Sequence, residues 1–155
     1  MNVKKTYERL EHLDSLLVML DDGAKAPVRA HDEDAGLDLF NFNEGKTVIP
    51  ALGKAVFHTG VHVEIPYGYY GKIESKSGLN VKHGVVSCGG VIDSGYGGEI
   101  MVALYNLSSE DFVSEHGDKI AQLIVQKCEL PAVVIVNEIS SGERGDSGFG
   151  STGRK

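Results

Sequence analysis

The chain has 155 residues, among them 20 glycines and no tryptophan, and 41% of it is hydrophobic. This composition fits one folded domain with many turns and excludes a disordered or membrane-embedded protein. The formal net charge of −7 argues against nucleic acid as a direct partner, because proteins that bind its phosphate backbone usually carry a basic stripe.

Targeting and membrane signals are absent from this sequence. Residues 1–14 are charged and lack the apolar stretch of a secretory signal, and no run approaches the length of a membrane span. Cys88 and Cys128 have no metal-ligand spacing, so we interpret both as reduced thiols. We therefore expect an intracellular, cytoplasmic protein without contact to a membrane.

The predicted elements are short and follow one another closely. Residues 4–13 suit one short helix, and residues 61–65 alternate apolar and polar side chains as a half-buried strand does. The predicted strands are 15–20, 54–59, 61–65, 69–75, 98–106, 120–127 and 132–138. Many short strands without a long helix are typical of a jelly roll. We predict an all-β fold, a jelly-roll-like distorted β-barrel.

The composition divides the chain into three parts. Residues 1–14 form an N-terminal extension, residues 15–139 the barrel domain and residues 140–155 an arm. In the arm, glycine, serine and charged residues prevail, and Phe149 is the single large apolar residue. Because such a segment cannot bury itself, we predict that it is flexible.

Residues 89–99 carry five glycines, the carboxylate of Asp93 and the ring of Tyr96. Val91 and Ile92 suit the end of a strand, residues 94–95 a turn and residues 98–106 the returning strand. A hairpin with so few side chains can touch a flat small molecule with its backbone. Asp is also a common turn former, so this stretch alone leaves the role of Asp93 open.

The arm has the chemistry of an anion site. Arg144 offers a fork of donors suited to phosphate, Ser151 and Thr152 offer hydroxyls, and the glycines let backbone N–H groups approach an anion closely. Phe149 could cover a base.

Five motifs together resemble the trimeric dUTP diphosphatases (dUTPases) over residues 15–153. The motifs are Ala35-Gly36-Leu37-Asp38-Leu39, Ser75-Lys76-Ser77-Gly78-Leu79, residues 90–99, Gly117-Asp118-Lys119-Ile120-Ala121-Gln122-Leu123 and residues 144–153. The resemblance implies hydrolysis of dUTP to dUMP and pyrophosphate by attack of water on the α-phosphorus, with Mg²⁺ on the triphosphate. Such an enzyme limits uracil incorporation into DNA and supplies dUMP for thymidylate synthesis.

The resemblance also implies a role for each matching residue. Asp93 would be the general base, the ring of Tyr96 would lie under the deoxyribose and exclude UTP, and the backbone at Gly90 would read uracil. Phosphate binding would fall to Lys76, Ser77, Gly78 and Gln122, and Asp38 would organise the water shell of the metal. The arm residues Arg144, Phe149, Gly150, Ser151 and Thr152 would close over the nucleotide. A homotrimer would share its active sites among three subunits.

Three positions depart from the family pattern, and other functions stay open. Lys76 and Lys119 stand where arginine is common, and Gly97 stands where a larger residue is frequent. Lys76 loses the planar fork of arginine, whereas we expect Lys119 to serve subunit or surface contacts.

A dCTP deaminase needs a glutamate where this chain has Ala103. A nucleotide-sensing module without turnover, or a jelly roll that binds no nucleotide, remains the alternative from another class.

Overall fold

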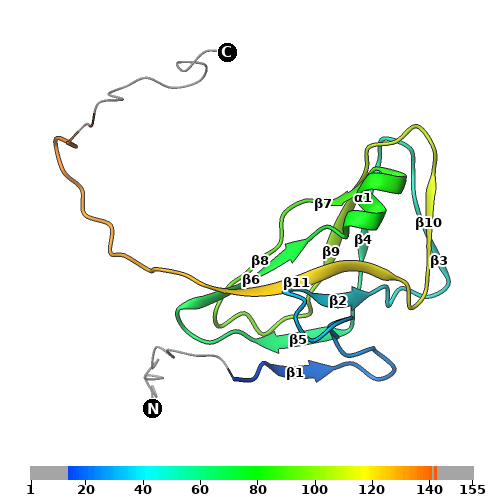
Figure 1. The fold of residues 1–155 in the computed structure, drawn as a ribbon, viewed down its shortest axis with the longest axis horizontal. Helices are drawn as coiled ribbons and strands as arrows, with labels where there is room; N and C mark the ends of the chain where they lie inside the picture. The colour runs from blue at the N-terminus through cyan, green and yellow to red at the C-terminus, as the bar shows by residue number, and fades with distance from the viewer. Residues whose placement is uncertain (1–13, 141, 143–155) are drawn as a thin grey trace.

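The computed structural model describes residues 14–140 and residue 142. This part of the chain contains eleven short strands and one helix, so the predicted all-β class is confirmed (Figure 1). The helix predicted at 4–13 and the motif at 144–153 lie outside the described residues. No helix of the described part is long and apolar enough to cross a membrane.

The elements follow the chain with short connections. They are β1 (Leu17–Leu20), β2 (Leu37–Phe40), β3 (Lys46–Ile49), β4 (Lys54–Phe57), β5 (Val61–Glu64), β6 (Tyr69–Glu74), α1 (Ser77–His83), β7 (Val85–Ser87), β8 (Val91–Ile92), β9 (Val102–Asn106), β10 (Phe112–Glu115) and β11 (Lys119–Lys127). Strands β2, β3, β7 and β10 were not among the predicted ones.

The strands form antiparallel sheets around one core. The largest sheet has the order β2-β11-β6-β8, a second has the order β4-β9-β7, and β1-β5 and β3-β10 are separate pairs. Alternate residues of β6 and β9 point inward, which gives the period of two that half-buried strands require. The fully buried apolar side chains include Leu39, Ile49, Phe57, Ile100, Leu104, Ile120 and Leu123. This arrangement bears out the predicted jelly-roll-like β-fold.

The strand predicted at 132–138 is wrong. These residues form no strand, and they extend away from the sheets after β11 (Figure 1). Val133 and Ile135 are 93% and 94% exposed. The residue types suit a strand, but a strand also needs a neighbouring edge, and no other described strand of this chain pairs with the segment.

The hairpin predicted around Asp93 is also wrong in its pairing. Strand β8 pairs with β6, whereas β9 pairs with β4 and β7, so the chain between them connects two sheets. The backbone N–H of Ile100 donates to Val61 O at 2.8 Å, which attaches the expected start of the returning strand to β5. The turn itself is present, because the N–H of Tyr96 donates to Asp93 O at 3.1 Å.

Candidate functional site

Asp38 lies at the centre of a charged cluster that joins three of the motifs. It is 4% exposed, and its carboxylate forms ion pairs with Lys76 and Lys119, the second at 2.7 Å between Oδ2 and Nζ. Burial opposes ionisation of Asp38, but the two ammonium groups more than offset this and hold its pKa below the usual value. We expected surface or subunit contacts for Lys119; within this chain it pairs with Asp38.

Gln122 lies beside this cluster because β11 pairs with both β2 and β6. It is opposite Asp38 on one side and Glu74 on the other, and its amide donates to Ser75 O at 3.1 Å. A Cβ at Gly36 would lie 2.1 Å from Gln122 Oε1, so the glycine of the first motif makes room for this amide. Ala121 and Leu123 are buried in the core. The first, second and fourth motifs therefore meet at one place.

The second motif continues into α1. Lys76 is the N-cap with extended backbone angles, no side chain caps this end, and no acidic residue stands in the first turn. Ser77 and Gly78 are exposed. Backbone N–H groups in the first turn of a helix have no partner within the helix and favour anions.

The loop that follows β7 begins next to the second motif. The hydroxyl oxygen of Ser75 accepts from the N–H of Ser87 at 2.8 Å, and the N–H of Ile73 donates to Gly90 O at 2.8 Å. Gly90 has a φ of +110°, and a Cβ there would lie 2.6 Å from Cβ of Ile73. Only glycine fits this approach without strain.

Asp93 follows β8 and is exposed. It borders a hollow of about 320 Å³ that is lined by Tyr67, Tyr69, Tyr70, Asp93, Ser94, Cys128 and Leu130. An exposed carboxylate beside a hollow can bind a water molecule and accept its proton. Local sequence patterns do not connect these tyrosines with Asp93, since Tyr69 and Tyr70 belong to β6 and Tyr67 to the turn before it.

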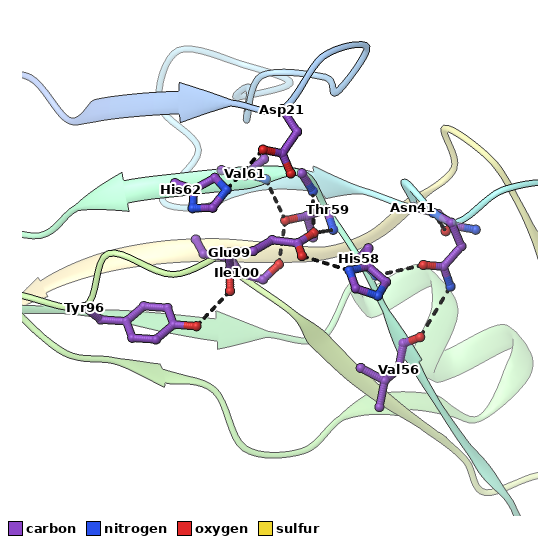
Figure 2. Close-up of polar contacts among 12 residues, drawn as sticks. Asp21, Asn41, Val56, His58, Thr59, Val61, His62, Tyr96, Glu99 and Ile100 are labelled. Carbon is purple, nitrogen blue, oxygen red and sulfur yellow. Dashed lines mark hydrogen bonds and ion pairs between the residues drawn. The ribbon is translucent and has the colours of Figure 1, made fainter.

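Tyr96 lies farther along the same loop, and Figure 2 shows how its hydroxyl is directed. The hydroxyl donates to Glu99 O at 3.0 Å, and the side chain is 46% exposed. Among the described residues, no hydrogen bond or ion pair joins Asp93 or Tyr96 to Ser77 or Gln122. By direct polar contacts, the predicted site residues therefore form two groups on this chain, one at Asp38 and one at Asp93 and Tyr96, while Gly90 of the same loop contacts Ile73 beside the second motif.

Glu99 fixes the end of this loop, and sequence reasoning did not single it out. Its carboxylate accepts from the N–H groups of Thr59 and Gly60 at 3.0 and 2.8 Å and lies 2.8 Å from His58 Nδ1 (Figure 2). Burial opposes ionisation of Glu99, but these contacts outweigh it and lower the pKa. The Nδ1 of His62 lies 3.2 Å from Gly97 O and gives the loop a second contact.

The described residues do not form a cage for a metal ion. They contain no group of three or more His, Cys, Asp or Glu side chains suited to hold one. Asp38 already has two ammonium partners, so it does not fit as a direct ligand. Its predicted contact through water stays a prediction.

Comparison with known proteins identifies the family. The sequence model of the dUTPase family matches residues 22–153. The chain belongs to the dUTPase family. It is 41% identical over 142 residues to the deoxyuridine 5′-triphosphate nucleotidohydrolase of Paramecium bursaria Chlorella virus 1, covering 91% of this chain and 99% of the relative. The corresponding protein of Mycobacterium marinum is 43% identical over 145 residues, covering 88% of this chain and 93% of that relative.

Solved dUTPases of the same family share the fold. The dUTPase of Staphylococcus bacteriophage 80alpha, solved with dUpNHpp, has a TM-score of 0.82 and 32% identity, covering 91% of this chain and 99% of its own. A mutant dUTPase from phage phi11 of S. aureus, which coordinates a structural Mg(II) ion, has a TM-score of 0.74 and 30% identity, covering 83% of this chain and 100% of its own.

Proposed function

We propose that this dUTPase-family chain is a hydrolase that converts dUTP to dUMP and pyrophosphate. Its relatives are named deoxyuridine 5′-triphosphate nucleotidohydrolases, and this chain matches them over nearly their whole length. The observation that carries the proposal is that the first, second and fourth motifs bring Lys76, Lys119 and the Gln122 amide together. The loop of the third motif exposes the carboxylate of Asp93. The product dUMP would serve thymidylate synthesis, and removal of dUTP would limit uracil in DNA.

Asp93 would act as the general base in this reaction. Its carboxylate would accept a proton from the water that attacks the α-phosphorus, and pyrophosphate would leave in line. Positioning of the water and neutralisation of charge supply most of the catalysis in phosphoryl transfer. The exposure of Asp93 beside a hollow supports this role.

Phosphate oxygens would bind at Lys76, the start of α1 and Gln122. Lys76 shares Asp38 with Lys119, so a phosphate group would compete with a carboxylate for two cations. Ser77 and Gly78 are exposed there. The arm residues Arg144, Phe149, Gly150, Ser151 and Thr152 would complete the site.

Discrimination between nucleotides would depend on the loop of the third motif. The backbone at Gly90 would read the edge of uracil, and the Tyr96 ring would lie against the deoxyribose where UTP carries a 2′-hydroxyl. Mg²⁺ keeps several waters and is commonly held through substrate phosphates, so we propose that it binds with the triphosphate.

A homotrimer would unite the two groups of site residues. Within one chain, the Asp38 cluster and the Tyr96 loop share no hydrogen bond or ion pair among the described residues. Exposed apolar side chains of Val133, Ile135, Leu17 and Met19 support burial against a second copy. Cys88 and Cys128 form no disulfide with each other, which suits the reducing cytoplasm, where we propose that the enzyme acts.

The test is incubation of the purified protein with Mg²⁺ and, separately, dUTP, UTP, dTTP and dCTP, followed by chromatography of the products. We expect dUMP and pyrophosphate from dUTP alone, and loss of turnover when EDTA removes the metal. Tight binding of dUTP without any turnover would contradict the proposal and favour a nucleotide sensor. Release of dUTP from dCTP would indicate a deaminase.

A further inference from the structure

The hydroxyl end of the Tyr96 ring fills the space where a side chain at position 98 would begin. A Cβ at Gly98 would come within 2.5 Å of Oη and 2.6 Å of Cζ of Tyr96, which is closer than real side chains approach. The φ of Gly98 is not positive, so its backbone suits any residue. The position of the Tyr96 ring, and not the backbone conformation, therefore requires glycine at position 98.

The end of the ring is held at the next residue. The Tyr96 hydroxyl donates to Glu99 O, and the Glu99 side chain is bound to the turn at Thr59 and Gly60 (Figure 2). The hydroxyl of Thr59 also donates to Ile100 O at 2.6 Å. The carbonyl that receives the Tyr96 hydroxyl thus belongs to a segment fixed on both sides.

We propose that Gly98 is a specificity-determining position that acts through Tyr96. This inference rests on the proposed contact between the Tyr96 ring and the deoxyribose. The ring can exclude a 2′-hydroxyl only while its position is fixed, because a ring that moves aside leaves room for the hydroxyl. A methyl group at Gly98 would displace the ring and break its hydrogen bond to Glu99, so the boundary would be lost.

Gly97 provides a matched control for this test. It lies in the same loop, its φ is not positive, and nothing lies within 4 Å of the place where a Cβ would stand. Gly97→Ala and Gly98→Ala therefore make the same chemical change to neighbouring residues, and only the second meets Tyr96.

The experiment measures dissociation constants of dUDP and UDP by calorimetry for the wild type, Gly98→Ala and Gly97→Ala. We expect the preference for dUDP over UDP to fall about tenfold or more in Gly98→Ala, the size of effect that one small group in a pocket produces. Gly97→Ala should keep the wild-type preference. The melting temperature of Gly98→Ala should stay close to the wild type, because the clash involves the movable end of a side chain.

A double-mutant cycle measures the same dissociation constants of dUDP and UDP for Tyr96→Ala with and without Gly98→Ala. If Gly98 acts through the ring, Gly98→Ala should change the preference no further there. An unchanged preference in Gly98→Ala, an additional loss in the Tyr96→Ala background, or equal binding of dUDP and UDP by the wild type would each overturn the inference. Failure of the wild type to hydrolyse dUTP would count against the proposed function alone, since the diphosphates test binding of the sugar without turnover.

Discussion

Asp93 is the proposed general base, so its exchange for the amide is the sharpest test at the scale of single residues. Asp93→Asn keeps the shape of the side chain but cannot accept a proton. We expect turnover of dUTP to fall about 100-fold to 10,000-fold, the usual contribution of a general base, with the dissociation constant of dUDP nearly unchanged.

A second exposed aspartate serves as the control for this variant. Asp32 lies in the exposed stretch before the first motif, so Asp32→Asn removes the same charge from the surface without touching the loop. Rates measured side by side should differ only for Asp93→Asn. Full turnover by Asp93→Asn would exclude it as the base.

Asp38 makes the stability of the protein depend on pH. Its pKa is lowered in the folded state, so the unfolded state binds a proton more readily, and the stabilisation is present above the ordinary pKa of about 3.8. It is lost as the pH falls through the lowered folded value. We expect the urea midpoint of the wild type to drop over that acidic range.

The variant Asp38→Asn isolates this contribution. It leaves the two ammonium groups without their carboxylate, and we expect a loss of about 1–3 kcal/mol at neutral pH. The difference in urea midpoint between variant and wild type should shrink as the pH falls from about 3.8 through the lowered folded pKa, because the unfolded wild type binds a proton at Asp38 first and the folded carboxyl becomes neutral only afterwards. A difference that stays constant with pH would contradict the ion-pair assignment.

At the scale of elements, the contact between β6 and the start of β8 places the loop of the third motif. It depends on Gly90, where the chain passes so close to Ile73 that no side chain fits. The same strand β6 pairs with β11 on its other side. A single strand therefore joins the loop to the strand that carries Gln122.

Gly90→Ala should weaken this junction more than Gly89→Ala. Both glycines have positive φ, so both substitutions cost about 1–2 kcal/mol of backbone strain. Only Gly90→Ala also meets Ile73, which adds about 1–3 kcal/mol of overpacking. Thermal or urea unfolding of the two variants checks the difference, and equal losses would show that the contact with Ile73 is not important.

At the scale of the whole molecule, the exposed apolar segment after β11 supports the proposed homotrimer. Its apolar side chains at Val133 and Ile135 are almost fully exposed on one chain, and exposure of neighbouring β-branched residues to water is unfavourable. Strand β1 also exposes Leu17 and Met19. A second copy could cover both surfaces and bring the Asp38 cluster to another chain's loop.

We expect a mass in solution of about 50 kDa, three times that of the 16.6 kDa chain, in sedimentation experiments. Ile135→Asp should reduce the mass toward that of one chain and abolish dUTP turnover, because a buried unpaired carboxylate disfavours the interface. Ile135→Val should keep the trimer, since it stays apolar. A wild type that sediments as a monomer, with full turnover, would contradict the shared site.

The sequence predicted those features that depend on local pattern and residue chemistry. The alternation at Val61, Val63 and Ile65 identified β5 because a half-buried strand requires a period of two. The run of β-branched residues at 132–138 wrongly predicted a strand, because no strand edge among the described residues pairs with it. Strands β2 and β3 escaped prediction for different reasons: β2 buries the charged Asp38 beside Leu39, and β3 has apolar side chains only at Val48 and Ile49.

The sequence by itself determined the all-β class, the family motifs and the residue types available for a nucleotide. Only the tertiary structure decided that Lys119 pairs with Asp38, that β8 pairs with β6 and not with β9, and that the Tyr96 ring needs a glycine beneath it at Gly98. Pairing of distant strands depends on which edges and registers bury the most apolar surface at once, and that competition is settled by the whole chain and not by any local segment.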